Sequence, residues 1–259
     1  MTMPEPATVF LMYHEIELPL RSLCQSEPGY VRYVISIDEF QGQMSAIQEL
    51  GLRGVSVGEA LRFESPAVAI TVDDGCETDL LTIAPALKQF GYGATFYITA
   101  GLLGKTGYMS AGQLRELSAL DFEIGNHSMT HPYLSDLDDA SLHHEIADSK
   151  VMLENIIGKA VEHFSCPGGR YDSRAILVAK NAGYRTLANS TPRANSPSTD
   201  TFALGRVAIT RDLSQTTFKK LCRGETLWQL ALRMGLRDRA KRLLGNAAYD
   251  RVRSTLLNR

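Results

Sequence analysis

The chain has 259 residues, enough for one large domain with a substantial core. Its hydrophobic content of 44% and charged content of 22% are ordinary for a globular protein and exclude low-complexity, collagen-like and intrinsically disordered classes. The formal net charge of −2 hides an asymmetry, because residues 211–259 hold 12 Lys or Arg and 4 Asp or Glu, a balance of about +8 that leaves about −10 for residues 1–210. No nucleic-acid partner is expected, because the larger part is acidic and the basic part has no nucleic-acid-reading motif.

The N-terminus and the cysteines both favour a cytoplasmic protein. Residues Met1–Ala7 contain no basic patch followed by an apolar stretch, and the apolar segment Val9–Met12 is far too short to direct export or to cross a membrane. The cysteines are scattered without a CxxC pair, which fits reduced thiols better than a disulfide framework and gives no zinc-finger pattern. They are Cys24, Cys76, Cys166 and Cys222.

In chain order, short β-branched segments alternate with helical patterns. The predicted strands are Val9–Tyr13, Ala67–Val72, Gly93–Ile98, Phe122–Ile124, Val161–Cys166 and Tyr184–Leu187. The predicted helices are Ile37–Leu50, Thr78–Phe90, Ser110–Leu120 with Ser110 as its cap, Asp138–Ile157 and Ser173–Ala182. This alternation favours a mainly parallel α/β sheet, either closed into a barrel or open and doubly wound.

The helix predicted at Asp138–Ile157 has one apolar stripe. The stripe consists of Leu142, Ile146, Leu153 and Ile157. Polar positions of the same helix are expected to face solvent, namely His143, His144, Glu145 and Asp148. Further along, the segment Asn189–Thr201 is rich in Ser, Thr and Pro and is predicted to be a long loop that could cover a site.

Carboxylate and imidazole side chains follow two of the predicted strands. Asp73 and Asp74 come directly after one strand, and His127 and His131 follow another. Because the carboxyl ends of parallel strands meet on one rim, we expect these four side chains to lie together. Either motif alone is often a turn or a chance pair, but the combination indicates a site. Neighbouring side chains at a strand end diverge, so one carboxylate can bind a metal while the other stays free beside it.

Two imidazoles four residues apart reach one ion if the loop between them makes roughly one turn, and Asp74 would complete a site of two histidines and one carboxylate. Zinc is the default for this set, and iron, cobalt, nickel and manganese also fit it. A metal lowers the pKa of bound water from 15.7 to about 7, and Asp73 is the candidate base for the proton. Pro132 disfavours α geometry at His131, which predicts an irregular loop there. Cys76 is expected to be a packed small side chain rather than a further ligand.

Three motifs resemble those of the polysaccharide deacetylase family, carbohydrate esterase family 4. "TVDDG" (71–75) looks like the family's T-F-D-D-G, "HSMTHP" (127–132) like H-[ST]-x-x-H-P, and "FSCPGGRYD" (164–172) like its aromatic-rich, proline-centred third motif. The resemblance covers roughly residues 8–210. It implies a deformed, TIM-like (β/α) barrel of about seven strands that hydrolyses N-acetyl groups of amino sugars.

The resemblance also implies roles for single residues. Asp73 would be the general base, and the main-chain N–H of Gly168 would help to stabilise the oxyanion, since attack on an amide carbonyl builds negative charge on oxygen. The implied metal ligands are Asp74, His127 and His131. The implied contacts to the substrate come from Pro167, Arg170 and Tyr171.

The chain departs from the family's pattern at two places. Ser165 stands where the third motif usually opens with an arginine, and Arg170 either substitutes by reaching back to the free aspartate or is a surface residue. Most relatives protonate the leaving amine from a histidine near the C-terminus, and no histidine follows His163 here. His14, at the exit of the first predicted strand, can supply this acid, as in family members that act on poly-N-acetylglucosamine. The alternative is a histidine satisfied by a buried hydrogen bond.

The basic tail needs its own explanation. We divide the chain into a catalytic domain at residues 1–210 and a basic helical extension at residues 211–259. Within the extension, "LWQLALRMGLRDRAKRLLG" (227–245) has an apolar stripe flanked by cations, which either packs on the domain or lies on an anionic membrane surface. The flanking cations are Arg233, Arg237, Arg239, Lys241 and Arg242. If the extension contacts a membrane, a lipid-linked sugar or an intermediate of surface-polysaccharide synthesis would be a suitable substrate. If it does not, a soluble amino sugar or oligosaccharide is an equally reasonable substrate.

The expected function is metal-dependent removal of N-acetyl groups from an N-acetylated saccharide. Two alternatives stay open, because fold alone does not choose between them. One is hydrolysis of another C–N bond, as in a deformylase of a lipid-linked amino sugar or a cyclic amide hydrolase. The other is a catalytically inactive carbohydrate-binding protein, which the missing late histidine keeps in consideration.

Overall fold

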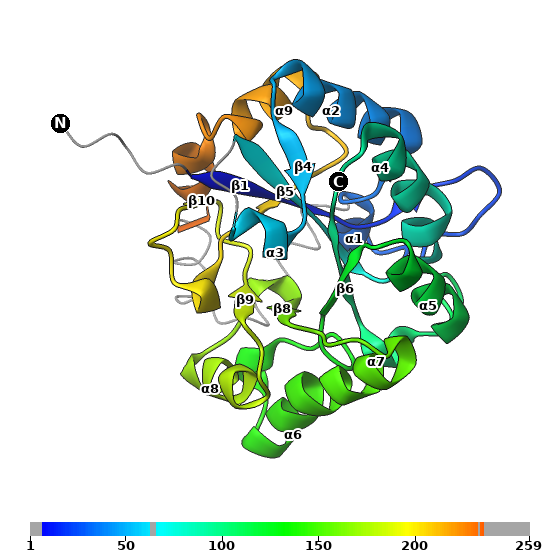
Figure 1. Cartoon of the computed structure of the whole chain (residues 1–259), viewed down its shortest axis with the longest axis vertical. Helices are drawn as coiled ribbons and strands as arrows, with labels where there is room; N and C mark the ends of the chain where they lie inside the picture. The colour runs from blue at the N-terminus through cyan, green and yellow to red at the C-terminus, as the bar shows by residue number, and fades with distance from the viewer. Residues whose placement is uncertain (1–6, 63–65, 233, 236–259) are drawn as a thin grey trace.

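The computed structural model of the protein describes residues 7–62, 66–232 and 234–235, in which helices surround a curled sheet (Figure 1). In spatial order the sheet consists of β10 (Ala194–Asn195), β1 (Thr8–Tyr13), β5 (Ala67–Asp74), β6 (Thr95–Ile98), β7 (Glu123–Asn126), β8 (His163–Ser165) and β9 (Thr186–Ala188). Each pairing from β1 to β9 is parallel. The predicted α/β fold, a deformed (β/α) barrel of about seven strands, is confirmed.

The chain beyond β9 closes the barrel. Leu204 bridges Ala188 of β9 in parallel, and β11 (Val207–Ala208) then pairs in parallel with β1. The strand β10 pairs with β1 in the antiparallel direction. The segment Asn189–Thr201, predicted as a loop, therefore contributes an edge strand, and residues 204–208 span the gap between β9 and β1.

Three further strands are only two or three residues long, which explains why the period of two in the sequence did not reveal them. β4 (Arg53–Val55) and β6 lie along the same edge of β5. β4 pairs with the first half of β5, and β6 pairs with the second half. β2 (Ile16–Glu17) and β3 (Ile35–Ser36) form a separate parallel pair.

Helices cover the outside of the barrel (Figure 1). They are α1 (Pro28–Val31), α2 (Ile37–Glu49), α3 (Val57–Ala60), α4 (Ala84–Phe90), α5 (Ala111–Ala119), α6 (Asp139–His143), α7 (Ser149–Ile157), α8 (Ser173–Asn181) and α9 (Gln215–Cys222). Ser110 caps α5 as predicted, because its Oγ accepts a hydrogen bond from the backbone N–H of Gln113 at 3.2 Å. Two π-helical turns, Asp79–Ile83 before α4 and His144–Asp148 between α6 and α7, shift the helical register.

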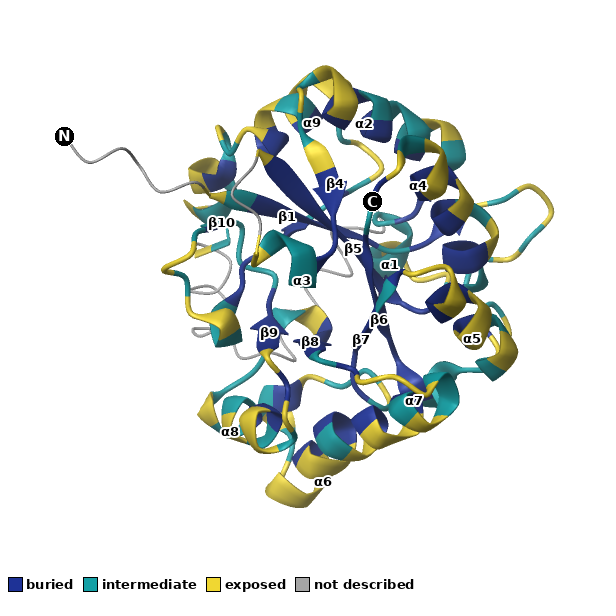
Figure 2. Cartoon of the chain, in the orientation of Figure 1, coloured by how far each residue is buried: buried dark blue, intermediate teal, exposed yellow. Residues whose placement is uncertain are grey.

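The core has two parts, and Figure 2 shows that the strands are buried while the helices expose their outer faces. The larger part packs the helices against the sheet. The smaller part joins side chains of β1, β5, β6 and β9, so it lies inside the barrel, and it consists of Phe10, Val57, Ala69, Tyr97, Ala188 and Leu204. Each large apolar side chain in these parts stabilises the fold by about 1.5–3 kcal/mol relative to exposure. All eight residues of β5 are buried, including the two aspartates at its end.

The C-terminal part of the described chain begins with α9, which lies beside α2. Phe218 and Leu221 of α9 are buried in the larger core, and Lys219 pairs with Glu49 of α2 at 2.6 Å. Residues 227–232 continue as helix, with Trp228 65% exposed. Arg233, Arg237, Arg239, Lys241 and Arg242, the predicted cationic flanks, lie outside the described residues. Among the described residues, no helix is long and apolar enough to cross a membrane.

Candidate metal centre and active site

The carboxyl end of β5 presents two aspartates that serve different partners, as predicted. Asp74 has a φ of 85° and Gly75 a φ of 84°, so the backbone turns sharply just after the strand. Left-handed backbone is costly for an aspartate and is concentrated at functional sites. The side chain of Asp73 contacts Arg206, and that of Asp74 faces His127 and His131.

Asp74, His127 and His131 converge on one point. The distance from Asp74 Oδ1 to Nε2 is 3.6 Å for His127 and 3.5 Å for His131. One ligating atom from each residue lies within 4.8 Å of the other two. Asp74 Oδ1 is buried and accepts no hydrogen bond from the described residues. A buried carboxylate oxygen without a donor is costly unless a cation satisfies it, so this set fits a divalent metal ion.

His127 is prepared as a metal ligand by its surroundings. Its Nδ1 lies 2.9 Å from the carbonyl oxygen of Ser165. Because a carbonyl only accepts, Nδ1 carries the proton and Nε2 presents its lone pair toward Asp74. Burial lowers the pKa of His127 to about 4, although Asp73 opposes the shift. The imidazole is therefore neutral at pH 7, as a ligand must be.

The loop that carries His131 is irregular, as Pro132 predicted. Ser128 and His131 have φ values of 72° and 67°. The Ser128 hydroxyl accepts a hydrogen bond from the backbone N–H of His131 at 2.9 Å. The carboxylate of Glu145 accepts from the N–H groups of Met129 and Thr130 at 2.9 and 2.8 Å, so it holds the loop from the side of the helices.

The prediction that Glu145 faces solvent is wrong. Its side chain is 5% exposed and lies against the histidine loop, while His143 and Asp148 of the same segment remain outside. The physical reason is that the histidine loop satisfies the carboxylate, because the Thr130 hydroxyl also donates to Glu145 at 2.6 Å beside the two backbone N–H groups. The hydropathy pattern of the helix does not reveal this burial, because the compensating donors lie on another segment of the chain.

Asp73 forms a buried, two-pronged ion pair with Arg206. Arg206 Nη1 lies 2.6 Å from Oδ1 and Nη2 lies 2.8 Å from Oδ2. Burial alone would raise the pKa of the Asp73 carboxyl, but the Arg206 guanidinium and His127 hold that pKa well below its usual range. The remaining donors of Arg206 reach Thr71 Oγ1, Ser165 Oγ and the carbonyl of Asn189. All five N–H donors therefore have acceptors, which a fully buried guanidinium requires.

Arg206, and not Arg170, supplies the cation beside the free aspartate. Ser165, at the position of the family's usual arginine, is small enough to leave room, and its Oγ accepts from Arg206 Nη2 at 2.6 Å. The hypothesis that Arg170 reaches back is wrong, since its guanidinium carbon lies 3.9 Å from the centre of the Tyr133 ring. Sequence reasoning missed Arg206 in "LGRVAI", although a lone arginine inside an apolar segment is itself a signal that a buried carboxylate is near.

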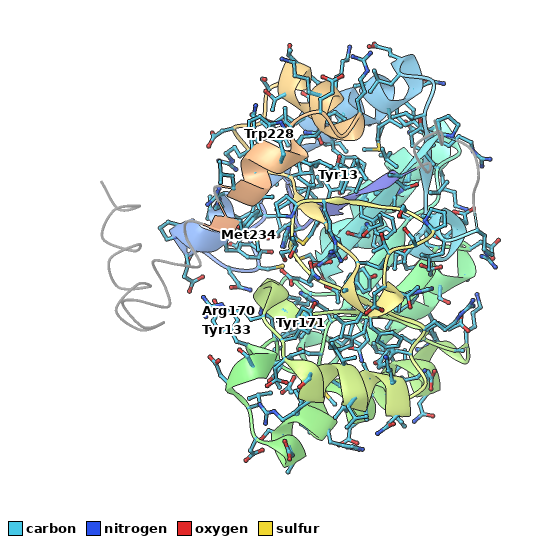
Figure 3. All side chains as sticks on the ribbon, turned by 90° about the vertical axis from the view of Figure 1, so that its left-hand side faces the viewer. Tyr13, Tyr133, Arg170, Tyr171, Trp228 and Met234 are labelled. Atoms are coloured by element: carbon cyan, nitrogen blue, oxygen red, sulfur yellow. The ribbon has the colours of Figure 1, made fainter. Side chains whose placement is uncertain are left out.

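The third motif adjoins the site through Ser165, whose carbonyl oxygen lies 2.9 Å from His127 Nδ1. Pro167 is buried in a 3₁₀ turn, Pro167–Gly169, and Gly168 has a φ of 59°. A Cβ at Gly168 would stand 2.6 Å from Cε1 of Tyr133, so only glycine fits. Figure 3 shows Arg170 and Tyr133 together near the surface, with Tyr171 beside them. The Tyr171 hydroxyl accepts a hydrogen bond from Nδ2 of Asn189 at 3.2 Å.

His14, at the end of β1, lies near the two aspartates. Its ring stacks on Tyr33, with centroids 4.8 Å apart, and its Nδ1 is buried without a hydrogen-bond partner among the described residues. At Nδ1 the structure therefore does not support the alternative for His14, a histidine satisfied by a buried hydrogen bond. Burial lowers the pKa of His14, and the charges of Asp74 and Asp73 oppose that shift.

Comparison with known proteins points to one family. Residues 61–187 match the sequence profile described as "Polysaccharide deacetylase". A Bacillus subtilis protein that carries the name of a polysaccharide deacetylase is 27% identical over 187 residues, which is 70% of this chain and 67% of that protein. The peptidoglycan-N-acetylglucosamine deacetylase of Bacillus cereus is 33% identical over 46% of this chain and 54% of its own length. The chain thus spans between about half and two thirds of these relatives.

Solved structures share the fold. The deacetylase of Streptococcus pyogenes, solved with acetate, superposes with a TM-score of 0.74 over 84% of this chain and 99% of its own, at 20% identity. IcaB from Ammonifex degensii superposes with a TM-score of 0.68 over 83% of this chain and 97% of its own, at 25% identity. The similarity therefore extends over nearly the whole barrel.

Proposed function

This chain belongs to the polysaccharide deacetylase family, and from that premise we propose that it is a metal-dependent hydrolase that removes N-acetyl groups from an N-acetylated saccharide. One observation carries the proposal. It is the buried Oδ1 of Asp74, which has no hydrogen-bond donor within the described part of the chain and faces the Nε2 atoms of His127 and His131. A buried carboxylate oxygen that faces two imidazole nitrogens without a donor is the arrangement that a divalent cation would satisfy.

Asp74, His127 and His131 would hold the ion, with zinc as the default for this donor set. When bound, the ion would polarise the acetyl carbonyl and lower the pKa of the attacking water. His131 is the most exposed of the three, with 37% of its side chain accessible, so the site opens to solvent on its side. A saccharide would approach from there.

Asp73 is suited to take a proton. Its carboxylate lies 3.6 Å from His127 Nε2, beside the three candidate ligands, without being one of them. Arg206 keeps it ionised and fixes both oxygens in one orientation. Because its pKa lies well below the usual range, the base is in its reactive form throughout the neutral range.

His14 and Gly168 complete the proposed machinery. His14 would return a proton to the leaving amine, which must be protonated before it departs. The N–H of Gly168 would donate to the oxyanion, supported by the strained turn that keeps Pro167 buried. Arg170 and Tyr171 would contact the sugar at the outer edge, beside Tyr133 (Figure 3).

Acetate release from N-acetylglucosamine oligomers by the zinc-supplied protein tests the proposal. Asp73→Asn should lower kcat by about 10²–10⁴-fold, the usual contribution of a general base, and should keep its metal because no ligand is removed. Asp212→Asn, at an exposed position, is the matched control and should behave like the wild type.

Other outcomes separate the alternatives. Full activity of Asp73→Asn would reject its role as base. Release of formate from an N-formyl amino sugar, without acetate from the acetylated one, would indicate a deformylase. Tight saccharide binding by wild-type protein without any product would indicate an inactive carbohydrate-binding protein.

We also propose a cytoplasmic location and, through residues 226–259, peripheral contact with a membrane that carries a lipid-linked substrate. The cationic composition of that segment supports the membrane contact. Co-sedimentation with anionic liposomes, compared with a deletion from residue 226, tests it. Equal binding by both proteins would reject it.

A further inference from the structure

Two cysteines outside the proposed machinery are in direct contact. Cys24 lies half-buried in the irregular segment 18–27, and Cys76 is fully buried two residues after Asp74. Their Sγ atoms are 2.9 Å apart. We propose that Cys24 and Cys76 are a redox-responsive pair: they are thiols in a reducing cytoplasm, and in oxidising surroundings they form an intramolecular disulfide that ties the segment 18–27 to the end of β5.

The backbone on both sides already holds the two cysteines in place. The N–H of Cys24 donates to both carboxylate oxygens of Glu15, at 3.2 and 3.0 Å. Cys76 forms a β-bridge with Tyr108. A disulfide bond of about 2.05 Å requires the two sulfur atoms to approach by only roughly a further 0.9 Å. The bond therefore needs only a small movement of the two sulfur atoms.

Bond formation leaves the neighbouring polar groups satisfied. The thiol of Cys24 contacts the carbonyl oxygen of Gly107 at 3.0 Å, and that oxygen also accepts from Arg21 Nη2 at 2.6 Å. The hydroxyl of Tyr30 lies 3.4 Å from Cys76 Sγ and donates to Glu15 Oε2 at 2.9 Å. Loss of the two thiol hydrogens thus costs neither the Gly107 carbonyl nor the Tyr30 hydroxyl its partner.

A metal ion is the other occupant that this cluster suggests, since Glu15, Cys24 and Cys76 offer three ligand atoms within 4.8 Å of one another. The charges argue against it. Glu15 already pairs with the Arg21 guanidinium and accepts the Cys24 N–H and the Tyr30 hydroxyl. A cation there would displace these donors and lie beside a fixed positive charge.

The oxidation proceeds by thiol–disulfide exchange with a small-molecule disulfide such as oxidised glutathione. The sulfur of Cys24, the more exposed cysteine, attacks one sulfur of that disulfide, forms a mixed disulfide and releases one thiol. Cys76 then attacks the Cys24 sulfur, forms the internal bond and releases the second thiol. The two protein thiols are oxidised, the small disulfide is reduced, and the two thiol protons pass to the released molecules.

The bond would connect two strand ends of the candidate site. Cys76 follows Asp74, and Cys24 is anchored to Glu15, the neighbour of His14. It would close a loop between positions 52 apart in the sequence. A crosslink over such a loop should raise the melting temperature of this protein by about 5–10 °C.

The test uses the full chain in glutathione buffers of increasing oxidised fraction. Peptide mapping by mass spectrometry should find the Cys24 peptide joined to the Cys76 peptide, and thiol titration should fall by two while Cys166 and Cys222 stay reduced. The melting temperature should rise with the same dependence on the buffer. Neither readout involves hydrolysis, so the outcome is independent of the proposed function.

Cys24→Ser should lose both the linked peptide and the thermal shift, while Cys222→Ser, which removes another buried cysteine, should keep both. The mapping of wild-type protein needs no variant, so poor folding of either one leaves the test intact. Absence of the linked peptide in fully oxidised buffer would overturn the proposal. One extra zinc ion per chain that Cys24→Ser loses would also overturn it, in favour of a metal site.

Discussion

The strand β7 begins with Glu123 at the amino end of the barrel, and His127 directly follows its last residue at the carboxyl end. The two ends of the barrel use their carboxylate and imidazole groups differently. At the amino end, the Glu123 carboxylate accepts hydrogen bonds from Thr95 Oγ1 at 2.5 Å and from the N–H of Gly58 at 3.0 Å. His163 lies 3.4 Å from the same carboxylate, and its Nδ1 lies 2.9 Å from Thr186 Oγ1. Both members of this acid–histidine pair are satisfied within the protein.

At the carboxyl end, a similar set of groups is left incomplete. Asp74 Oδ1 and His14 Nδ1 are buried without partners among the described residues, and Asp74 lies opposite two imidazole nitrogens. The amino end also has a hollow of about 510 Å³, lined by Glu123, Lys88 and Lys159 among others. The comparison teaches that neither an acid–histidine pair nor a hollow marks a ligand site by itself, whereas an unsatisfied carboxylate oxygen that converges with two imidazole nitrogens does.

The largest expected effect comes from Asp74→Asn. Loss of a residue that only hydrogen-bonds to a metal ligand weakens metal binding by roughly 10–100-fold. Loss of the Asp74 charge should weaken zinc binding by more than that and should abolish acetate release. Glu123→Gln, the same change at the other end of the barrel, should keep the metal. Zinc titration by calorimetry measures both variants, and wild-type affinity in Asp74→Asn would contradict the assignment of the ligand set.

Arg206→Met should destabilise the protein by about 3–5 kcal/mol, because it leaves the Asp73 carboxylate buried and unpaired. Arg174→Met, which breaks ion pairs of an arginine with a 41% exposed side chain, should cost less than about 1 kcal/mol. Urea unfolding measures both changes. If the unpaired Asp73 carboxylate causes the loss of stability, the double variant Asp73→Asn/Arg206→Met should be more stable than Arg206→Met alone. A lower free energy of unfolding for the double variant would contradict this explanation.

The metal-free protein should lose stability as the pH falls from about 6.5 to about 4. In that window the unfolded chain binds a proton at His127, whose pKa there is ordinary, while the folded protein does not, because burial lowers that pKa to about 4. The loss should be roughly 3 kcal/mol, because a shift of one pKa unit corresponds to about 1.4 kcal/mol. Urea unfolding in the presence of a chelator, compared with His127→Gln, isolates it, and an identical pH dependence of the two proteins would contradict it.

The smallest effect is expected from Glu123→Gln on stability itself. The amide keeps one acceptor oxygen for Thr95 or Gly58 and loses the charge beside His163, so we expect a cost of about 1–2 kcal/mol. Acetate release per folded molecule should be unchanged. A drop in turnover comparable to that of Asp73→Asn would show that the two ends of the barrel are not independent.

Much of the fold and of the candidate site was accessible from local patterns. The period of two, the helix cap at Ser110 and the alternation of strands and helices predicted the parallel barrel, and the strand-end rule brought Asp74 to His127 and His131. These features depend on neighbours in the chain or on a general property of parallel sheets. The short strands β4, β10 and β11 escaped because two or three residues carry no period.

Tertiary structure alone decided which residues complete the site. Arg206 reaches Asp73 across 133 positions because barrel closure brings residues 204–208 between β9 and β1. Glu145 lies inside because the N–H groups of the histidine loop satisfy its carboxylate, and Cys24 meets Cys76 because the segment 18–27 folds back over the end of β5. The sequence determined the chemical groups of the site and the rim of the barrel that they share. The pairing of the buried charges depended on barrel closure, because a buried ion needs a partner that is close in space and can be distant in the sequence.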